Sequence, residues 1–199
     1  EVQIVDGYIT MPARTARLYG TFSPSNTQVE YEVVKYKETL TPSADSIKSG
    51  DTWYDKEVTT RSARALSSVQ ESFTAYEGYH INVERTKNAT ENNIQHLEKT
   101  VTVNPSGDEI ETDTYVTNDT SSVEAGNYTS ISGKVYADGT TKFAAYYDLN
   151  TWSVRYSYEN ESNNPVGAPS VPVDSSLHKV GEQVTVSKQN QEVVGYTFN

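Results

Sequence analysis

The stretch WSVRYSY at residues 152–158 shows the clearest period-two alternation in the chain. Its aromatic and aliphatic side chains all fall on one face of an extended backbone, which is the pattern of a half-buried β-strand. The same alternation recurs in four further segments: QVEYEV (28–33), YHINV (79–83), TVTV (100–103) and QVTV (183–186). The repeated pattern predicts an all-β, mainly antiparallel fold.

Clusters of turn residues separate these segments. NPSGD (104–108) is one such cluster, and ADG (137–139) resembles the Asp-Gly signal of a tight hairpin. Helical signal is scarce: residues 90–99 place Ile94 and Leu97 three apart behind a candidate N-cap, and residues 42–48 form a weaker candidate. We therefore expect β-grasp-like or sandwich modules with at most one or two short helices.

Composition limits the partners and the chemistry. The chain of 199 residues carries a formal net charge of −11, which disfavours nucleic acid and anionic membrane surfaces as partners. It contains 15 Tyr, an aromatic content that argues against disorder. It contains no Cys, which excludes thiol nucleophiles, Cys-type zinc sites and disulfides. No apolar run reaches the length of a membrane-spanning helix, so we expect no membrane insertion.

A search for catalytic and metal-binding patterns predicts no enzyme, no metal and no cofactor. The three histidines, His80, His96 and His178, are scattered and show no metal-ligand spacing. No nucleophile elbow, phosphate-binding loop or dinucleotide fingerprint is present. Glu109, Glu111 and Asp113 share one face of a predicted strand, where a calcium or acid–base site competes with the simpler interpretation of a solvated face that blocks edge-to-edge aggregation.

Four aromatic residues are candidates for stacking on a sugar. Trp53 and Tyr54 follow a Gly-Asp turn, and Tyr146 and Tyr147 place neighbouring rings on opposite faces of a strand. Unless a second layer covers both faces, some of these rings must face outward. Packing in a core or an interface is the competing interpretation, and the one that we favour.

Both ends of the chain resemble halves of one repeat. DGYITMPA (6–13) followed by ARLYGTF (16–22) resembles the closing half of a Listeria–Bacteroides repeat, the internalin B-repeat family. PVGAP (165–169), VGEQVTV (180–186) and GYTF (195–198) resemble its opening half. The resemblance implies that residues 1–23 and 151–199 are complementary half-modules, which pair within one chain or between neighbouring copies.

The central stretch is similar to mucin-binding-protein (MucBP) repeats. VEY (29–31), YEGY (76–79), GKVYADG (133–139) and FAAYY (143–147) follow one another in the order of that family's strands and turns. The resemblance implies a central domain over residues 24–150. Residues 87–117 depart from the family pattern as an insertion.

These resemblances imply a structural or adhesive repeat of a Gram-positive bacterial cell-surface protein or extracellular fibre. The implied location is extracellular, and the implied partners are neighbouring repeats or copies of the chain that pair through strands. Proteins of this class sometimes carry a Lys–Asn isopeptide crosslink, for which Lys35, Lys37 and Asn150 are the candidates here, against ordinary surface lysines and a turn asparagine. The alternative is a carbohydrate-binding module that holds mucin or other glycans on the four aromatic residues.

Overall fold

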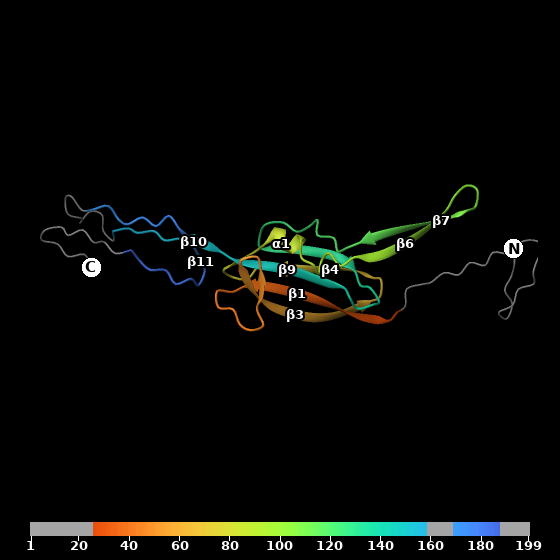
Figure 1. The fold of residues 1–199 in the computed structure, drawn as a ribbon, viewed down its shortest axis with the longest axis horizontal. Helices are drawn as coiled ribbons and strands as arrows, with labels where there is room; N and C mark the ends of the chain where they lie inside the picture. Colours follow the sequence, from red (N-terminus) through yellow and green to blue (C-terminus); the bar gives the residue numbers. More distant parts are fainter. Residues whose placement is uncertain (1–25, 159–168, 188–199) are drawn as a thin grey trace, which may run out of the picture.

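The computed structural model describes residues 26–158 and 169–187. The expected half-module at residues 1–23 and the GYTF motif at 195–198 lie outside these described residues. Within them, the chain is built almost entirely of strands and turns (Figure 1). The all-β, mainly antiparallel fold that the alternation predicts is confirmed.

A five-stranded sheet forms the centre of the molecule. Its order is β2 (Ile47–Ser49), β3 (Thr52–Arg64), β1 (Gln28–Glu38), β9 (Lys142–Leu149) and β5 (Tyr79–Ile81). β1 and β9 run parallel, and the other neighbouring strands in the sheet are antiparallel. The predicted strand at residues 28–33 is therefore the start of the middle strand of this sheet.

Three smaller sheets complete the described fold. β4 (Ser68–Thr74) pairs with β8 (Tyr128–Lys134), and this second layer packs on one face of the five-stranded sheet. β6 (His96–Val103) and β7 (Glu109–Val116) form a ribbon that projects from the body (Figure 1). β10 (Thr151–Ser153) and β11 (Leu177–Lys179) form a short pair beyond the end of β9.

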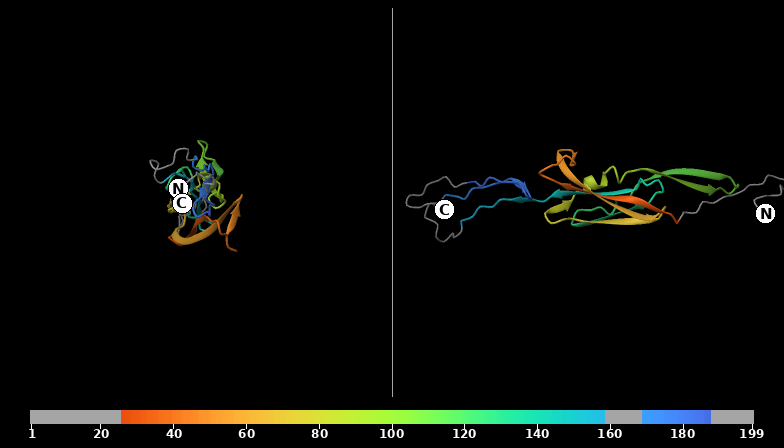
Figure 2. Two further views of the ribbon diagram at one scale, coloured as in Figure 1. Left: turned by 90° about the vertical axis from the view of Figure 1, so that its left-hand side faces the viewer. Right: turned by 90° about the horizontal axis from the view of Figure 1, so that it is seen from below.

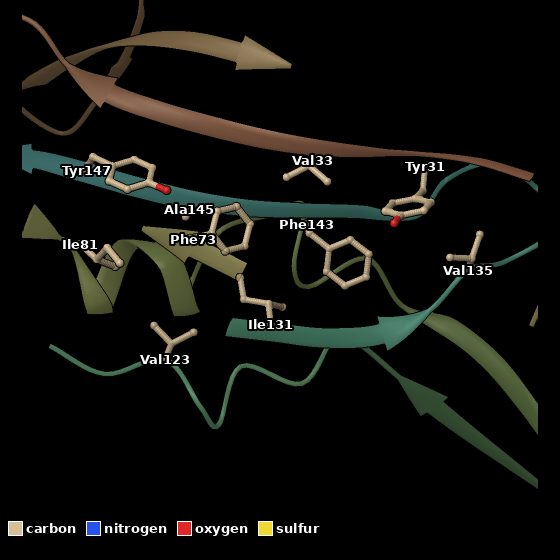
Figure 3. Close-up of a cluster of buried hydrophobic side chains, with 10 residues drawn as sticks. All are labelled: Tyr31, Val33, Phe73, Ile81, Val123, Ile131, Val135, Phe143, Ala145 and Tyr147. Atoms are coloured by element: carbon tan, nitrogen blue, oxygen red, sulfur yellow. The ribbon is translucent and has the colours of Figure 1, made fainter. Parts of the chain in front are cut away.

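The core lies on both faces of the central strands. On one face, the side chains of β1 and β9 meet those of β4 and β8, as Figure 3 shows; the fully enclosed members are Phe73, Val123, Ile131, Val135, Phe143, Ala145 and Tyr147. On the other face, a smaller cluster gathers under the short helix and the loop that follows it: Val34, Tyr36, Tyr54, Ala89, Ala144 and Tyr146. Two-sided burial explains the continuous apolar run FAAYY in β9, where a strand with one solvated face would alternate.

The hydroxyl of Tyr147 is buried and has no hydrogen-bond partner among the described residues. Burial raises the pKa of this phenol, so it stays neutral.

We expect Tyr147→Phe to leave the free energy of unfolding unchanged or to raise it by up to about 1 kcal/mol. The reason is that the Tyr147 hydroxyl loses its hydrogen bonds to water on folding and gains none in the protein. Tyr54→Phe is the control, since the buried Tyr54 hydroxyl donates to Asp148 Oδ1 at 2.6 Å. Urea titration should show a loss of about 1 kcal/mol for the control; an equal loss for both variants would contradict the assignment.

A buried carboxylate joins the two layers of the sandwich. Glu71 on β4 is 3% exposed. Its Oε1 accepts the Tyr31 hydroxyl proton at 2.6 Å, and its Oε2 lies 2.9 Å from Nη1 of Arg61 on β3. Burial and the bond to Glu71 raise the pKa of Tyr31 to about 12. The three groups connect β1, β3 and β4 through two charge-assisted contacts.

The helix forms at a different place from either candidate in the sequence. α1 (Val83–Lys87) begins after Asn82, whose side chain accepts the Arg85 N–H at 2.9 Å as an N-cap. Residues 90–93 form a turn, residues 94–95 have no regular structure, and β6 starts at His96. Residues 42–46 form no helix either, and β2 follows them. One short helix is present in the described residues, within the expected number, but both predicted positions were wrong.

Both predicted turns form, but only the first closes a hairpin, since β8 pairs with β4 while β9 pairs with β1 and β5. Gly107 closes the β6–β7 turn with φ +85°, and its N–H donates to the carbonyl of Asn104 at 2.9 Å. Gly139 closes the turn before β9 with φ +72°, where Asp138 Oδ1 accepts the Thr140 N–H at 3.0 Å. Both positions need the left-handed backbone that glycine adopts at little cost.

Candidate functional site

The parallel pair of β1 and β9, here called the central strand pair, is the feature with the clearest functional geometry. Its register runs from Glu32 opposite Lys142 to Lys37 opposite Tyr147. β1 is the first described strand, and β9 is the last strand of the five-stranded sheet in the chain. Because the two strands are parallel, the start of β1 and the end of β9 lie at opposite ends of the pair (Figure 2).

The backbone groups of β1 are divided between its two neighbours. The N–H of Thr39, just past the end of β1, donates to the Trp53 carbonyl on β3 at 2.9 Å, and the Glu32 N–H donates to the Thr141 carbonyl, just before β9, at 3.1 Å. The backbone N–H and C=O groups of odd-numbered residues in β1 therefore point toward β3, and those of even-numbered residues point toward β9. The central strand pair lies inside the sheet, where water has no access to its hydrogen bonds from the strand edges.

Aromatic rings reinforce this pair on both faces. The rings of Tyr36 and Tyr146 stack with centroids 4.4 Å apart, and Tyr54 meets Tyr146 edge-on at 5.0 Å. On the opposite face, Tyr31 meets Phe143 edge-on at 5.7 Å. Tyr36 also donates its hydroxyl proton to Glu91, and burial together with this bond raises its pKa. The contacts lock the register of β1 against β9 from above and below.

Side chains take the place of a neighbouring strand along the open edge of β9. β5 pairs with β9 only from Tyr147 to Leu149. Before that point, Asn92 serves both backbone groups of Ala144: its Oδ1 accepts the N–H at 2.9 Å, and its Nδ2 donates to the carbonyl at 2.9 Å. Thr86 Oγ1 accepts the Tyr146 N–H at 3.0 Å. These bonds satisfy backbone groups that would otherwise be buried without a partner.

The candidate sugar-stacking residues do not form an exposed platform. Tyr54 and Tyr147 are fully buried and Tyr146 is 9% exposed, so all three rings belong to the core. The favoured interpretation as core residues therefore agrees with the burial of these three rings, because β4–β8 covers one face of the sheet and the helix region covers the other. Trp53 is 38% exposed, with the Lys48 ammonium 5.8 Å from its ring.

The candidate crosslinking residues are engaged elsewhere. Lys35 lies 3.6 Å from Glu57, and the ammonium of Lys37 lies 4.5 Å from the centre of the Tyr76 ring. Asn150 Oδ1 contacts His80 Nδ1 at 3.0 Å. The structure shows no contact between either lysine and Asn150 within the described residues.

The acidic row on β7 is exposed. Glu109, Glu111 and Asp113 share one face of the β6–β7 ribbon, and Lys99 lies 3.6 Å from Glu111 and 3.8 Å from Asp113. Across residues 26–158 and 169–187, no group of three or more acidic or histidine side chains is arranged to hold a metal ion. In the same residues, no helix has the length and apolar character needed to cross a membrane.

A shallow depression of about 250 Å³ lies at the base of the ribbon. Three charged residues line it: Asp119 Oδ1 accepts the Ser121 N–H at 2.8 Å, and Lys134 Nζ contacts Glu98 Oε1 at 2.6 Å. The Tyr136 hydroxyl donates to the same carboxylate at 3.1 Å, and the Tyr136 ring stacks on His96 at 3.5 Å. The contacts of Glu98 with Lys134 and Tyr136 fasten the ribbon to the body.

Two carboxylates flank His178, the middle residue of β11. Asp174 Oδ2 lies 2.9 Å from His178 Nε2, and Glu182 Oε1 lies 3.3 Å from Nδ1. These two hydrogen bonds raise the pKa of His178 above 6.5. The protonated imidazole is favoured in the folded turn, so its contribution to stability is complete below the unfolded pKa and is lost as pH rises through the folded pKa.

We expect an NMR titration of the His178 ring to give a midpoint above 6.5. Asp174→Asn should lower this midpoint, because the neutral amide no longer favours the cation. A midpoint at or below the ordinary histidine value would show that the carboxylates do not hold the ring.

Sequence reasoning missed the residues that hold the centre together. Asn92 lies 52 positions before Ala144, and Glu71 lies 40 positions after Tyr31. No local pattern marks such residues, since their partners are backbone groups or side chains far along the chain. One signal was available for Asn92: it lies in the predicted helix at residues 90–99, and asparagine is unfavourable inside a helix.

No protein-family model, curated protein or solved structure matches this chain.

Proposed function

We propose that this chain is a load-bearing structural module of an extracellular bacterial surface protein or fibre. The carrying observation is the parallel central strand pair, whose chain enters at one end of β1 and leaves at the opposite end of β9. Tension along the chain then acts along the strands in opposite directions. All hydrogen bonds between the two strands must yield together, instead of one after another from an end.

Other features of the molecule suit this role. Aromatic contacts on both faces oppose sliding of β1 past β9. The chain contains no Cys, so disulfides cannot carry the load. The net charge of −11 keeps neighbouring fibres apart. The resemblance to internalin B-repeat and MucBP modules supports the surface location and, as partners, neighbouring repeats that pair through strands.

The glycan-binding alternative loses its main support, because three of its four candidate rings are buried. Trp53 is the remaining candidate. A glycan array tests it: a signal that disappears in Trp53→Ala would favour the binding module over a pure spacer.

Stretching the full chain between its two ends with an optical trap tests the proposal. We expect the central domain to resist to high force and then to unfold in one step. Unfolding of residues 28–149 releases roughly 400 Å of extended chain, less the folded length of the domain. Gradual extension at low force, without a discrete step, would contradict a load-bearing role.

A further inference from the structure

The end of the central domain holds a turn from the segment that follows it. After β9, the chain leaves through Asn150 and β10, and it returns through β11 to the same end of the domain (Figure 1). Glu38, the last residue of β1, is 4% exposed. Its Oε2 accepts the Leu149 N–H at 2.8 Å, and its Oε1 pairs with Nζ of Lys179. One buried carboxylate thus links the ends of β1 and β9 to β11.

Backbone contacts complete this seat. The Asn150 N–H donates to the Gly78 carbonyl at 2.8 Å, and the Val180 N–H donates to the Asn150 carbonyl at 2.9 Å. Gly78 has φ +81°, and a Cβ at this position would lie 3.2 Å from Val180 Cγ1. A side chain there would be strained and would press on Val180, so glycine allows the turn to approach the domain closely.

The returning turn has its own internal bonds. The Glu182 N–H donates to the Lys179 carbonyl at 3.0 Å, and Glu182 Oε2 accepts the Lys179 N–H at 2.9 Å. Gly181 takes the left-handed conformation, with φ +84°. The turn therefore presents Lys179 and Val180 to the seat in a fixed geometry, which lowers the entropy lost when they dock.

We infer that the turn at residues 179–182 and its seat at Glu38, Gly78 and Asn150 form a mechanical latch. Tension from the C-terminal side reaches Val180 before it reaches β9, because the contacts of the latch bridge the intervening residues 151–179. While the latch is closed, those residues carry no load. When it opens, they extend and the load passes to Asn150 and the central strand pair. This inference rests on the proposed function, namely that the chain works under tension.

The latch predicts an early step in a stretching experiment. Because the chain lacks Cys, Gln28→Cys and Thr185→Cys provide unique handles on the full chain. We expect a first step that releases roughly 100 Å of chain from residues 151–179, followed by the larger step of the central domain. The first step should reverse when the tension is relaxed.

Lys179→Met tests the ion pair between Lys179 and Glu38, because it removes the ammonium group and retains an unbranched side chain of similar length. The first step should move to markedly lower force or disappear, and the second step should keep its length. Lys99→Met, on the exposed ribbon, is the matched control and should change neither step. Hydrogen exchange at the Val180 amide provides a readout without force: exchange should be roughly tenfold faster in Lys179→Met than in the parent.

The outcomes separate the latch from the proposed function. A parent chain without a first step, with an unprotected Val180 amide, overturns the latch even if the central domain resists strongly. A first step that is unchanged in Lys179→Met overturns it as well. A clear first step, lost in Lys179→Met and followed by unfolding of the central domain at low force, supports the latch and contradicts the load-bearing domain.

Discussion

Asn92→Ala is expected to lower the free energy of unfolding by about 3–5 kcal/mol, because it leaves two buried backbone groups of Ala144 without partners and each costs roughly 1–3 kcal/mol. The asparagine is fully buried, and its Nδ2 also donates to the Thr86 carbonyl at 2.7 Å. The loss should appear as a fall of roughly 10 °C in the thermal midpoint.

Asn93→Ala is the control for this prediction. The neighbouring residue donates to the carbonyls of Ala89 and Lys87, at 2.9 and 3.2 Å, at the protein surface. Water can replace those bonds, so a loss below about 1 kcal/mol is expected. Similar losses for the two variants would mean that Asn92 does not substitute for a strand along β9.

Arg61→Met should destabilise the protein by about 2–3 kcal/mol, because it leaves Glu71 charged and buried without its cation. This expected loss is smaller than that for a fully buried ion pair, because the Arg61 side chain is 54% exposed and water screens its contact with Glu71. Lys56→Met on the same strand is the control. Lys56 is exposed, and Glu32, on which its charge acts, already has an ion pair with Lys142 at 2.8 Å, so the control should cost little.

Removing the carboxylate tests the cause of that loss. The double variant Arg61→Met with Glu71→Leu should recover part of the stability lost in Arg61→Met, because no buried charge remains. The Tyr31 hydroxyl still loses its acceptor, which limits the recovery. A double variant less stable than Arg61→Met would show that the charge was not the source of the penalty. Equilibrium denaturation in urea at neutral pH measures all four proteins.

The sequence predicted strands correctly where the alternating segment has a hydrogen-bonded neighbouring strand. The predictions at residues 28–33 and 100–103 fall within β1 and β6, and residues 79–83 contain β5. The clearest alternation, at 152–158, forms a strand only from Thr151 to Ser153, and residues 183–186 form none. Alternation shows how a side-chain face would be buried, but the backbone of a strand needs a hydrogen-bonded neighbour, and β11 pairs over three residues only.

The helix prediction failed for a related reason. Ile94 and Leu97 have helical spacing, but Asn92 two positions earlier binds the backbone of β9, and Leu97 pairs with Tyr115 in the ribbon. Contacts far along the chain overrode a weak local preference. The helix that does form is set by the N-cap at Asn82, which the sequence did not single out.

The candidate site was predictable in its residue types and not in its arrangement. The concentration of Tyr argued against disorder, and the interpretation of Tyr54, Tyr146 and Tyr147 as core residues agrees with their burial. The parallel pairing of β1 with β9 joins segments more than a hundred residues apart. Likewise, Glu38 and Lys179 are separated by 141 positions, so no local spacing brings them together.

The direction of pulling tests the central claim most directly. In Gln28→Cys with Thr151→Cys, force acts at opposite ends of the central strand pair and shears it. In Leu40→Cys with Thr151→Cys, force acts just past the same end of both strands and separates their hydrogen bonds one after another. We predict a several-fold higher unfolding force in the first arrangement. Equal forces in the two arrangements would contradict the account, because the parallel pair would then give the protein no resistance along its own chain.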